Sequence, residues 1–275
     1  MAGRDRFAGG DQDYLRDVQY RDPSRLTARA NLHARYSTSP IGWFDWVVSQ
    51  IDWPQSAAVL EVGCGPGWLW AATAPRLPPG LRLTLTDLSP GMVSVARARV
   101  AGLAHFDALE ARQADVEQIP YDDGAFDVVV ANHMLYHAPD PVRAVAELAR
   151  VLRHDGVLVA ATIGPRHLRE LDEIRFEILG GPVRKATAEA FGAVSGATIL
   201  GQSFGAVTWR DYEDELHCTD PDDVVAFITS TPPGESATPA QRAALRHAVD
   251  VRMEAGDGVL VVSKQTGLFL ARAPR

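Results

Sequence analysis

The stretch Val59-Leu-Glu-Val-Gly-Cys-Gly-Pro-Gly67 constrains the fold of this chain more than any other part of its sequence. It predicts a buried strand that runs directly into a glycine-rich turn, followed by a helix that begins near Trp68. Glycines let the backbone turn tightly and approach a ligand closely, and the first turn of the helix offers unpaired amide donors. The segment therefore predicts a nucleotide-type pocket at the end of a strand.

The spacing of the glycines and the acid before them narrow the kind of ligand. Dinucleotide enzymes use Gly-x-Gly-x-x-Gly, whereas Gly63, Gly65 and Gly67 form Gly-x-Gly-x-Gly, which disfavours a helix placed to hold a pyrophosphate. A carboxylate at Glu61 would repel phosphates but could accept hydrogen bonds from an ammonium group. The predicted ligand carries a sugar and an amine, and an NAD-type oxidoreductase is the disfavoured alternative.

Further segments follow the glycine turn in a compatible order, at residues 83–92, 113–115, 126–137 and 151–157. Together with the turn they resemble the class I S-adenosylmethionine (SAM) dependent methyltransferases, in particular the bacterial small-molecule family known as methyltransferase type 11 or UbiE-like. The resemblance covers residues 29–165 and weakens toward the C-terminus. It implies SAM as the cofactor and S-adenosylhomocysteine as its product.

The resemblance also implies roles for individual residues. Asp87 would hold the ribose hydroxyls and Asp115 would meet the adenine amino group, with a turn-capping carboxylate and a solvated loop as the respective alternatives. Leu88, Met92 and Val116 would form the walls around adenine, unless they are core residues. The implied cofactor site comprises Arg29, Tyr36, Glu61, Gly63, Cys64, Gly65, Gly67, Asp87, Leu88, Met92, Ala114, Asp115, Val116, Asn132 and His133.

The loop after the fourth strand carries the candidate catalytic residues His133, Tyr136 and His137. A histidine has a suitable pKa to take a proton from an acceptor near neutral pH, so His137 or His133 is a candidate general base. The alternative is that these side chains only shape the methionine end of the cofactor pocket. In the family, many such enzymes use no base because the departing sulfide is a good leaving group.

An N-terminal lid is implied by the segment 30–38, which resembles the lid that precedes the glycine turn in this family. Arg29, Arg35 or Tyr36 would close over the cofactor carboxylate, and surface salt bridges are the alternative. Ser39 and Pro40 are expected to open the next helix, since Ser caps helices and Pro is tolerated in their first turn. Its apolar residues at helical spacing are interpreted as core, with an aromatic stacking platform for substrate as the alternative: Trp43, Trp46, Val47 and Ile51.

Alternating apolar runs and amphipathic stretches from Ala57 onward indicate repeated β-α units. Strands are expected at 57–62, 81–86, 108–114, 126–131 and 156–162, and helices at 67–76, 90–101 and 140–153. The predicted fold class is α/β: a Rossmann-like, seven-stranded, mostly parallel sheet with an antiparallel C-terminal strand, flanked by helices, plus an N-terminal helical lid and a helical cap insertion. Such a sheet binds ligands at the carboxyl ends of its strands.

Four regions are predicted along the chain. They are an N-terminal helical lid at 1–52, a SAM-binding core at 53–164, a cap and acceptor-binding region with the sixth strand at 165–255, and a C-terminal strand at 256–275 that completes the sheet. The cap is expected to contain helical material at 165–204 with a break at 180–182, a strand at 207–212, and helices at 221–230 and 239–254. The runs 259–263 and 267–272 predict a bent or hairpin strand at a sheet edge.

Cap side chains that could line an acceptor pocket are His167, Glu170, Glu173, Arg175, Tyr212 and His217.

Composition excludes several other classes of protein. The 275-residue chain has a formal net charge of −8 and no run of basic residues interleaved with aromatics, so no nucleic-acid partner is expected. The sequence shows neither a signal peptide nor an apolar run of about 20 residues, which predicts a cytoplasmic protein without a membrane partner. Cys64 and Cys218 are expected to be reduced thiols, and no spacing of Cys, His, Asp or Glu predicts a metal site.

The expected reaction is direct displacement, in which an oxygen, nitrogen or carbon atom of a small molecule attacks the SAM methyl group. An acidic protein with a helical cap favours a small, partly apolar acceptor, and a secondary metabolite is the expectation. The alternative is a SAM-binding member of the fold that does not methylate, such as a cyclase, a lyase or a regulatory binding protein. A monomer and a homodimer are both compatible with the sequence.

Overall fold

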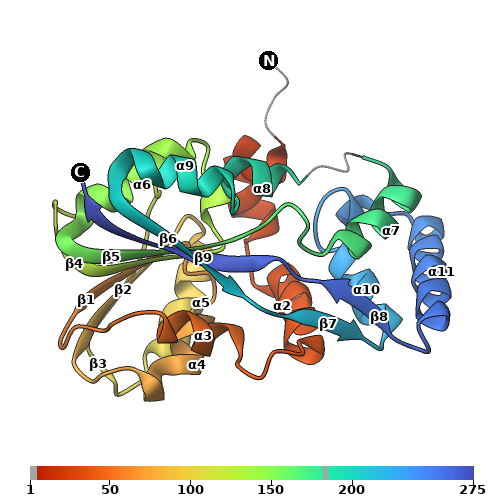
Figure 1. Cartoon of the computed structure of the whole chain (residues 1–275), viewed down its shortest axis with the longest axis horizontal. Helices are drawn as coiled ribbons and strands as arrows, with labels where there is room; N and C mark the ends of the chain where they lie inside the picture. The colour runs from red at the N-terminus through yellow and green to blue at the C-terminus, as the bar shows by residue number, and fades with distance from the viewer. Residues whose placement is uncertain (1–4, 182–184) are drawn as a thin grey trace.

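The computed structural model describes residues 5–181 and 185–275, and within them the chain folds around one seven-stranded sheet with helices on both faces (Figure 1). The strand order is β3-β2-β1-β4-β5-β9-β6. All neighbours pair in parallel except β9, which is antiparallel to both β5 and β6. The predicted fold class, including the antiparallel C-terminal strand, is confirmed.

The strands are β1 (Ala58–Val62), β2 (Leu81–Asp87), β3 (Phe106–Gln113), β4 (Phe126–Asn132), β5 (Leu152–Ile163), β6 (Phe204–Tyr212), β7 (Glu215–Cys218), β8 (Leu260–Ser263) and β9 (Thr266–Pro274). The helices are α1 (Gln12–Tyr14), α2 (Ser24–Tyr36), α3 (Trp43–Ser49), α4 (Trp68–Thr73), α5 (Pro90–Val100), α6 (Pro141–Val151), α7 (Arg169–Leu179), α8 (Ala186–Phe191), α9 (Ser195–Ser203), α10 (Pro221–Ile228) and α11 (Pro239–Ala255). No helix among these residues is long and apolar enough to cross a membrane.

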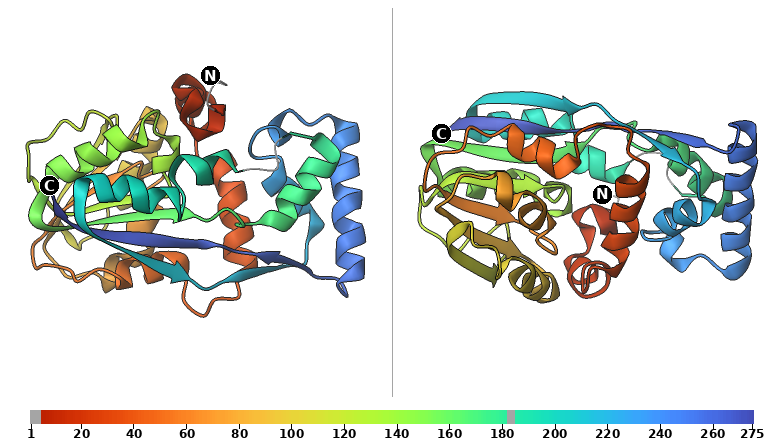
Figure 2. Two further views of the ribbon diagram at one scale, coloured as in Figure 1. Left: turned by 45° about the horizontal axis from the view of Figure 1, so that its top comes forward. Right: turned by 90° about the horizontal axis from the view of Figure 1, so that it is seen from below.

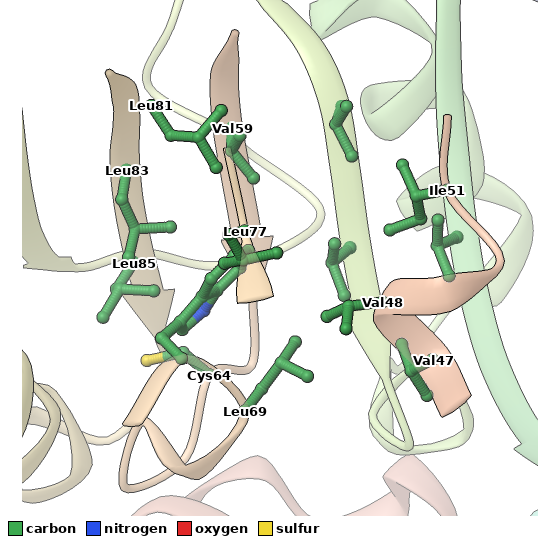
Figure 3. Close-up of a cluster of buried hydrophobic side chains, with 14 of the residues drawn as sticks. Val47, Val48, Ile51, Val59, Cys64, Leu69, Leu77, Leu81, Leu83 and Leu85 are labelled. Carbon is green, nitrogen blue, oxygen red and sulfur yellow. The ribbon is translucent and has the colours of Figure 1, made fainter. Parts of the chain in front are cut away.

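The central strands are apolar because both faces of the sheet are covered. Every residue of β1 is buried, which is the pattern of a parallel strand between two helical layers. On one face, Leu83 and Leu85 of β2 pack with Val59 of β1 and with Val47 and Val48 of α3 (Figure 3). A second cluster fills the other face under α6 and α9. The two clusters hold the sheet between its helices and so position the strand ends that form the site.

The chain order places a crevice beside the glycine turn. From β1 the chain moves outward through β2 to β3, and then returns to β4 on the other side of β1. This reversal separates the loops that leave β1 and β4, and open α/β sheets bind ligands at such a point. The carboxyl ends of β1 to β4 therefore face the same side of the sheet.

The expectation for the last two strands is wrong. β8 and β9 do not pair with each other: β8 pairs with β7 in a separate two-stranded sheet, while β9 lies inside the large sheet between β5 and β6. The edge strand is β6 instead. The apolar character of β9 follows from this interior position, since Leu268, Phe269 and Ala271 are all buried.

Two local expectations also fail. Ser39 does not cap a helix: α3 begins at Trp43 after Gly42, and the Ser39 amide instead donates to Asp214 at 3.1 Å. The strand expected at 156–162 begins earlier, since β5 starts at Leu152 and shifts its register against β4 between the pairs Phe126–Leu152 and Val128–Val157. The helix before it, α6, accordingly ends at Val151.

The cap stands beside the large sheet and has a core of its own. Helices α7, α10 and α11 and the β7–β8 pair share a third cluster of buried residues with Leu32 and Tyr36 of α2. Figures 1 and 2 show α2 between the large sheet and the cap, and the N-terminal turns beside α2. Strand β6 leads directly to β7, and β8 to β9, so two neighbouring connections run from one sheet to the other.

Candidate functional site

A cavity of about 1090 Å³ lies at the carboxyl ends of β1 to β4 and extends under the N-terminal segment and the cap. Single ligand pockets usually measure about 300–1,000 Å³, so this cavity is large enough for more than one small molecule. Its walls come from the glycine turn, the loops after β2, β3 and β4, helix α2, and the start of α7. Residues of the predicted lid, core and cap regions thus line the same cavity.

The glycine turn has the conformation that its sequence predicts. Gly63, Gly65 and Gly67 have φ values of 59°, 52° and 73°, in the left-handed region that favours glycine. A Cβ on Gly63 would lie 2.7 Å from the Cβ of Met134, so the loops after β1 and β4 touch at this point. Gly67 differs from the other two: it does not line the cavity, and its Cα packs against Ala96 of α5.

Two buried carboxyl groups stand at the ends of β1 and β2. The amides of Gly65 and Ser89 donate to the two oxygens of Asp87 at 2.9 and 2.8 Å, and Trp70 Nε1 donates to Glu61 at 2.6 Å. Burial raises the pKa of Asp87 to about 6 and the pKa of Glu61 to about 8. Both groups line the cavity and can accept hydrogen bonds from hydroxyl or ammonium donors there.

The third acid and the apolar wall lie beyond Asp87. Asp115 is exposed at the cavity rim and accepts the amide of Glu117 at 2.9 Å, while Leu88, Ala114 and Val116 also line the cavity. Met92 does not line it. Its side chain is only 1% exposed, because α5 turns it into the core, so the core alternative holds for this residue.

The lid residues divide between the cavity and the cap. Tyr36 does not line the cavity but donates its hydroxyl to Asp223 of α10 at 2.7 Å, and Arg35 pairs with the same carboxylate. The salt-bridge alternative therefore holds for Arg35, while Tyr36 makes a hydrogen bond to the cap. Arg29 does line the cavity, and its Nη2 is buried without a hydrogen-bond partner among the described residues. An unpaired guanidinium nitrogen in a cavity is suited to a carboxylate ligand.

His137 is occupied at both ring nitrogens. Its Nδ1 lies 2.6 Å from the carbonyl oxygen of Phe7, which can only accept, so Nδ1 carries the proton and Nε2 accepts from the Tyr20 hydroxyl at 2.8 Å. Burial lowers the pKa of His137 to about 3. This arrangement does not support a general base at His137, because the lone pair of Nε2 already has a donor. It makes His137 the attachment point of the N-terminal segment.

His133 and Tyr136 keep their access to the cavity. His133 has a left-handed backbone (φ 57°), and its ring lies 5.0 Å from that of Trp43. Burial and then the charge of Lys264 lower the pKa of His133 to about 4, while burial raises the pKa of the Tyr136 phenol. Asn132 accepts from Trp43 Nε1 at 3.3 Å. Trp43, interpreted from the sequence as core, is thus part of the cavity wall.

The N-terminal segment, residues 5–20, is docked on the core by several contacts. Gln12 donates to the carbonyl of His137 at 2.8 Å, and the Ser89 hydroxyl donates to the carbonyl of Tyr20 at 2.8 Å. A Cβ on Gly91 would lie 2.0 Å from the carbonyl oxygen of Arg21, so the chain at the end of this segment runs directly against α5. Phe7 and Tyr20 also line the cavity, and neither was singled out from the sequence.

The cap contributes His167, Arg175 and Tyr212 to the cavity wall, as the sequence interpretation allowed. Glu170, Glu173 and His217 do not line it. Glu170 accepts from the amide and hydroxyl of Ser263, and the His217 ring is 2.6 Å from Glu215 on the protein surface. Lys264, which sequence reasoning did not single out, also lines the cavity.

Comparison with known proteins agrees with this geometry. Residues 60–160 match the family model described as a methyltransferase domain. The chain is 30% identical over 117 residues to the ubiquinone/menaquinone biosynthesis C-methyltransferase of Citrifermentans bemidjiense, covering 42% of this chain and 50% of the relative. It is 37% identical over 115 residues to the malonyl-[acyl-carrier protein] O-methyltransferase of Serratia marcescens, covering 42% of each chain. The match therefore spans half or less of the length of these curated relatives.

Solved structures show the same fold over more of the chain. A methyltransferase-like protein of Bacillus halodurans aligns with a TM-score of 0.58 at 19% identity, covering 85% of this chain and 99% of the other. The [4+2]-cyclase SpnF aligns with a TM-score of 0.51 at 21% identity, covering 84% and 80%. At these identities the likeness establishes the fold, and the two proteins are named for different activities.

Proposed function

We propose that this protein transfers a methyl group from SAM to an oxygen, nitrogen or carbon atom of a small molecule, because residues 60–160 match a methyltransferase domain and the sheet has the fold of the class I SAM-dependent enzymes. The observation that carries the proposal is the placement of Glu61, Asp87 and Asp115 around a left-handed glycine turn at three neighbouring strand ends. This set provides hydrogen-bond acceptors and no phosphate cradle.

The residues fit the cofactor group by group. Asp87, fixed by the Gly65 and Ser89 amides, would accept the ribose hydroxyls, and Asp115 with Leu88 and Val116 would hold the adenine. Glu61 and the unpaired Nη2 of Arg29 would face the ammonium and carboxylate of the methionine part. When bound, SAM supplies a methyl group that is already activated by its positive sulfur.

The protein would then act mainly by positioning and by excluding water. The N-terminal segment covers the cavity through its contacts with His137 and Ser89, and the cap closes the opposite side. His133 and Tyr136 remain the side chains that could contact an acceptor next to the methyl group. A small acceptor fits this enclosure better than a macromolecule, and a secondary metabolite remains the proposed class.

A SAM-binding protein that does not methylate is the second candidate, since the cyclase SpnF shares the fold. The first test is isothermal titration of the protein with SAM and with S-adenosylhomocysteine, with Asp87→Ala as control. Binding of both ligands that is lost in the variant supports the cofactor site, and no binding by the wild type contradicts it. Release of S-adenosylhomocysteine from SAM in the presence of candidate acceptors then separates methyl transfer from the second candidate.

A further inference from the structure

The two ends of the cavity differ in their titratable side chains. Its cofactor half, formed by Glu61, Gly63, Asp87, Leu88, Asp115 and Val116, carries three carboxyl groups. Its acceptor half, formed by His33, Trp43, His167, Tyr212, Phe227 and Lys264, carries an ammonium group and two imidazoles on an otherwise apolar wall. Asp172, an acid from the cap that also lines the cavity, is paired with Lys185 at 2.6 Å.

The use of lysine in this chain is selective. The sequence contains 27 lysines and arginines, and only Lys185 and Lys264 are lysines. Both line the cavity, whereas the surface ion pairs are made by arginine. Lysine differs from arginine in carrying a compact charge on a flexible stem, with three donors that can be shared between partners. Both lysine ammonium groups of this sequence therefore lie at the cavity.

Lys264 lines the cavity and is held in place by an ion pair with a buried carboxylate outside the cavity. Its Nζ pairs with Asp214, whose side chain is 0% exposed and does not line the cavity. Asp214 is itself fixed by the Ser37 hydroxyl at 2.8 Å and by the amides of Thr38 and Ser39 at 3.0 and 3.1 Å. The ammonium lies 5.0 Å from the centre of the Tyr212 ring. Asp214 is its single anionic partner among the described residues, which leaves donors for a ligand.

The imidazoles next to Lys264 have unused hydrogen-bonding capacity. The rings of His33 and His167 stack at 6.0 Å, and His33 Nδ1 is buried without a hydrogen-bond partner in residues 5–181 and 185–275. His167 Nδ1 accepts from the amide of Gln265, the residue after Lys264, at 3.3 Å. Burial first, and then the Lys264 charge, lower the pKa of His33 to about 3. His33 is therefore neutral, and a neutral imidazole can donate one hydrogen bond and accept another, so the ring can contact a polar ligand group that also binds Lys264.

We propose that the acceptor is an organic acid whose anionic group binds Lys264 beside the stacked rings of His33 and His167, with its apolar part against Trp43, Tyr212 and Phe227. This inference rests on the proposed function and names its acceptor class. The competing interpretation is that the Lys264–Asp214 pair only joins the loop after β8 to the loop between β6 and β7, which Asp214 in turn connects to residues 37–39. The two interpretations differ in whether Lys264 responds to the charge of a ligand.

Because the chain has two lysines, side-chain NMR of protein labelled at lysine with ¹³C and ¹⁵N reports on Lys264 directly, and Lys185→Arg assigns the two signals. The protein is first saturated with S-adenosylhomocysteine, a binding step that by itself tests the proposed function. Matched pairs are then titrated: 4-hydroxybenzoate with 4-hydroxybenzamide, and octanoate with octanamide. We expect an acid to shift the Lys264 signal and to bind at least tenfold more tightly than its amide, a preference of the size expected for a charge-assisted contact.

The double variant Lys264→Met/Asp214→Asn removes both charges of the pair and so leaves no unpaired buried charge. It should bind S-adenosylhomocysteine like the wild type and lose the preference for acid over amide. Arg210→Met, which removes an exposed charge from β6, is the matched control and should retain the preference. The proposal is overturned if no acid shifts the Lys264 signal, if the amides shift it equally, or if the preference survives in the double variant.

Discussion

The Tyr20 hydroxyl donates to Nε2 of His137 across 2.8 Å, while Nδ1 of the same ring donates to the carbonyl of Phe7 at 2.6 Å. One imidazole therefore ties both ends of the N-terminal segment to the loop that leaves β4. A neutral ring with this tautomer satisfies both bonds, whereas a protonated ring would present a second N–H to the Tyr20 hydroxyl. This side chain acts together with the bonds of Gln12 and Ser89 to hold the segment over the cavity.

Tyr20→Phe should loosen the N-terminal segment without changing the core. The substitution leaves Nε2 of His137 without its donor, and a buried unpaired group costs about 1–3 kcal/mol. We expect faster hydrogen exchange confined to residues 5–20 and weaker SAM binding. Hydrogen exchange read by mass spectrometry checks this, with β1 as the internal reference. Unchanged exchange in residues 5–20 would show that the Tyr20–His137 bond does not hold the segment.

Gly91→Ala tests the docking of the same segment from the other side. The residue lies in the first turn of α5, where alanine favours the helix, but its Cβ would meet the Arg21 carbonyl oxygen at 2.0 Å. The N-terminal segment must then move, so SAM affinity should fall severalfold in isothermal titration. Gly201→Ala in α9, where a Cβ meets nothing within 4 Å, is the matched control. Equal affinities in the two variants would contradict the proposed lid.

SAM affinity should rise with pH through the titration of Asp87. Burial raises the pKa of this carboxyl to about 6, and both of its oxygens can accept from the ribose hydroxyls together only in the ionised form. Binding therefore releases a proton, and below pH 6 the affinity should fall by up to about tenfold per pH unit. Asp87→Asn should show weaker binding with a flatter profile. Isothermal titration with SAM between pH 5 and pH 7.5 measures this dependence. If the SAM affinity of the wild type varies with pH as little as that of the variant, Asp87 does not bind the ribose as a carboxylate.

Glu61 should make the fold less stable as pH rises from 7 to 8. Burial raises its folded-state pKa from 4.5 to about 8, so in this range the folded state binds a proton that the unfolded state lacks. The free energy of unfolding then decreases with pH, by about 1 kcal/mol over this unit relative to Glu61→Gln. Glutamine keeps an oxygen that accepts from Trp70 Nε1. Urea unfolding at both pH values measures the difference, and parallel losses in the two proteins would show that Glu61 is already ionised.

Local patterns predicted the parts of this molecule that local forces determine. The glycine turn, Asp87 and the parallel strands could be recognised because a strand, a turn and a helix start each have a signature within a few residues. Repeated β-α units predicted that the strands from β1 to β5 are parallel, whereas their order in the sheet came from the structure. The same information could not place β8 and β9, because two apolar runs joined by a short connection look like a hairpin whether they pair with each other or with distant strands.

The site was predictable where a residue's role depends on its own strand end, and not where it depends on a distant segment. His137 has the sequence context of a catalytic histidine, but its two hydrogen bonds come from Phe7 and Tyr20, more than a hundred residues away. Tyr36 likewise finds its partner on α10. Lys264 did leave a signal in the sequence, as one of two lysines among 27 basic residues, although its place in the cavity required the structure.

The interior position of β9 has a consequence for the synthesis of this protein. The ribosome makes this strand after every other element of the sheet, yet β5 and β6 can be joined only through it. Until residues 266–274 leave the exit tunnel, β5 and β6 each present an unpaired edge, and such edges are open to pairing with other chains. In the nascent protein the edges of β5 and β6 therefore stay unpaired until β9 inserts between them.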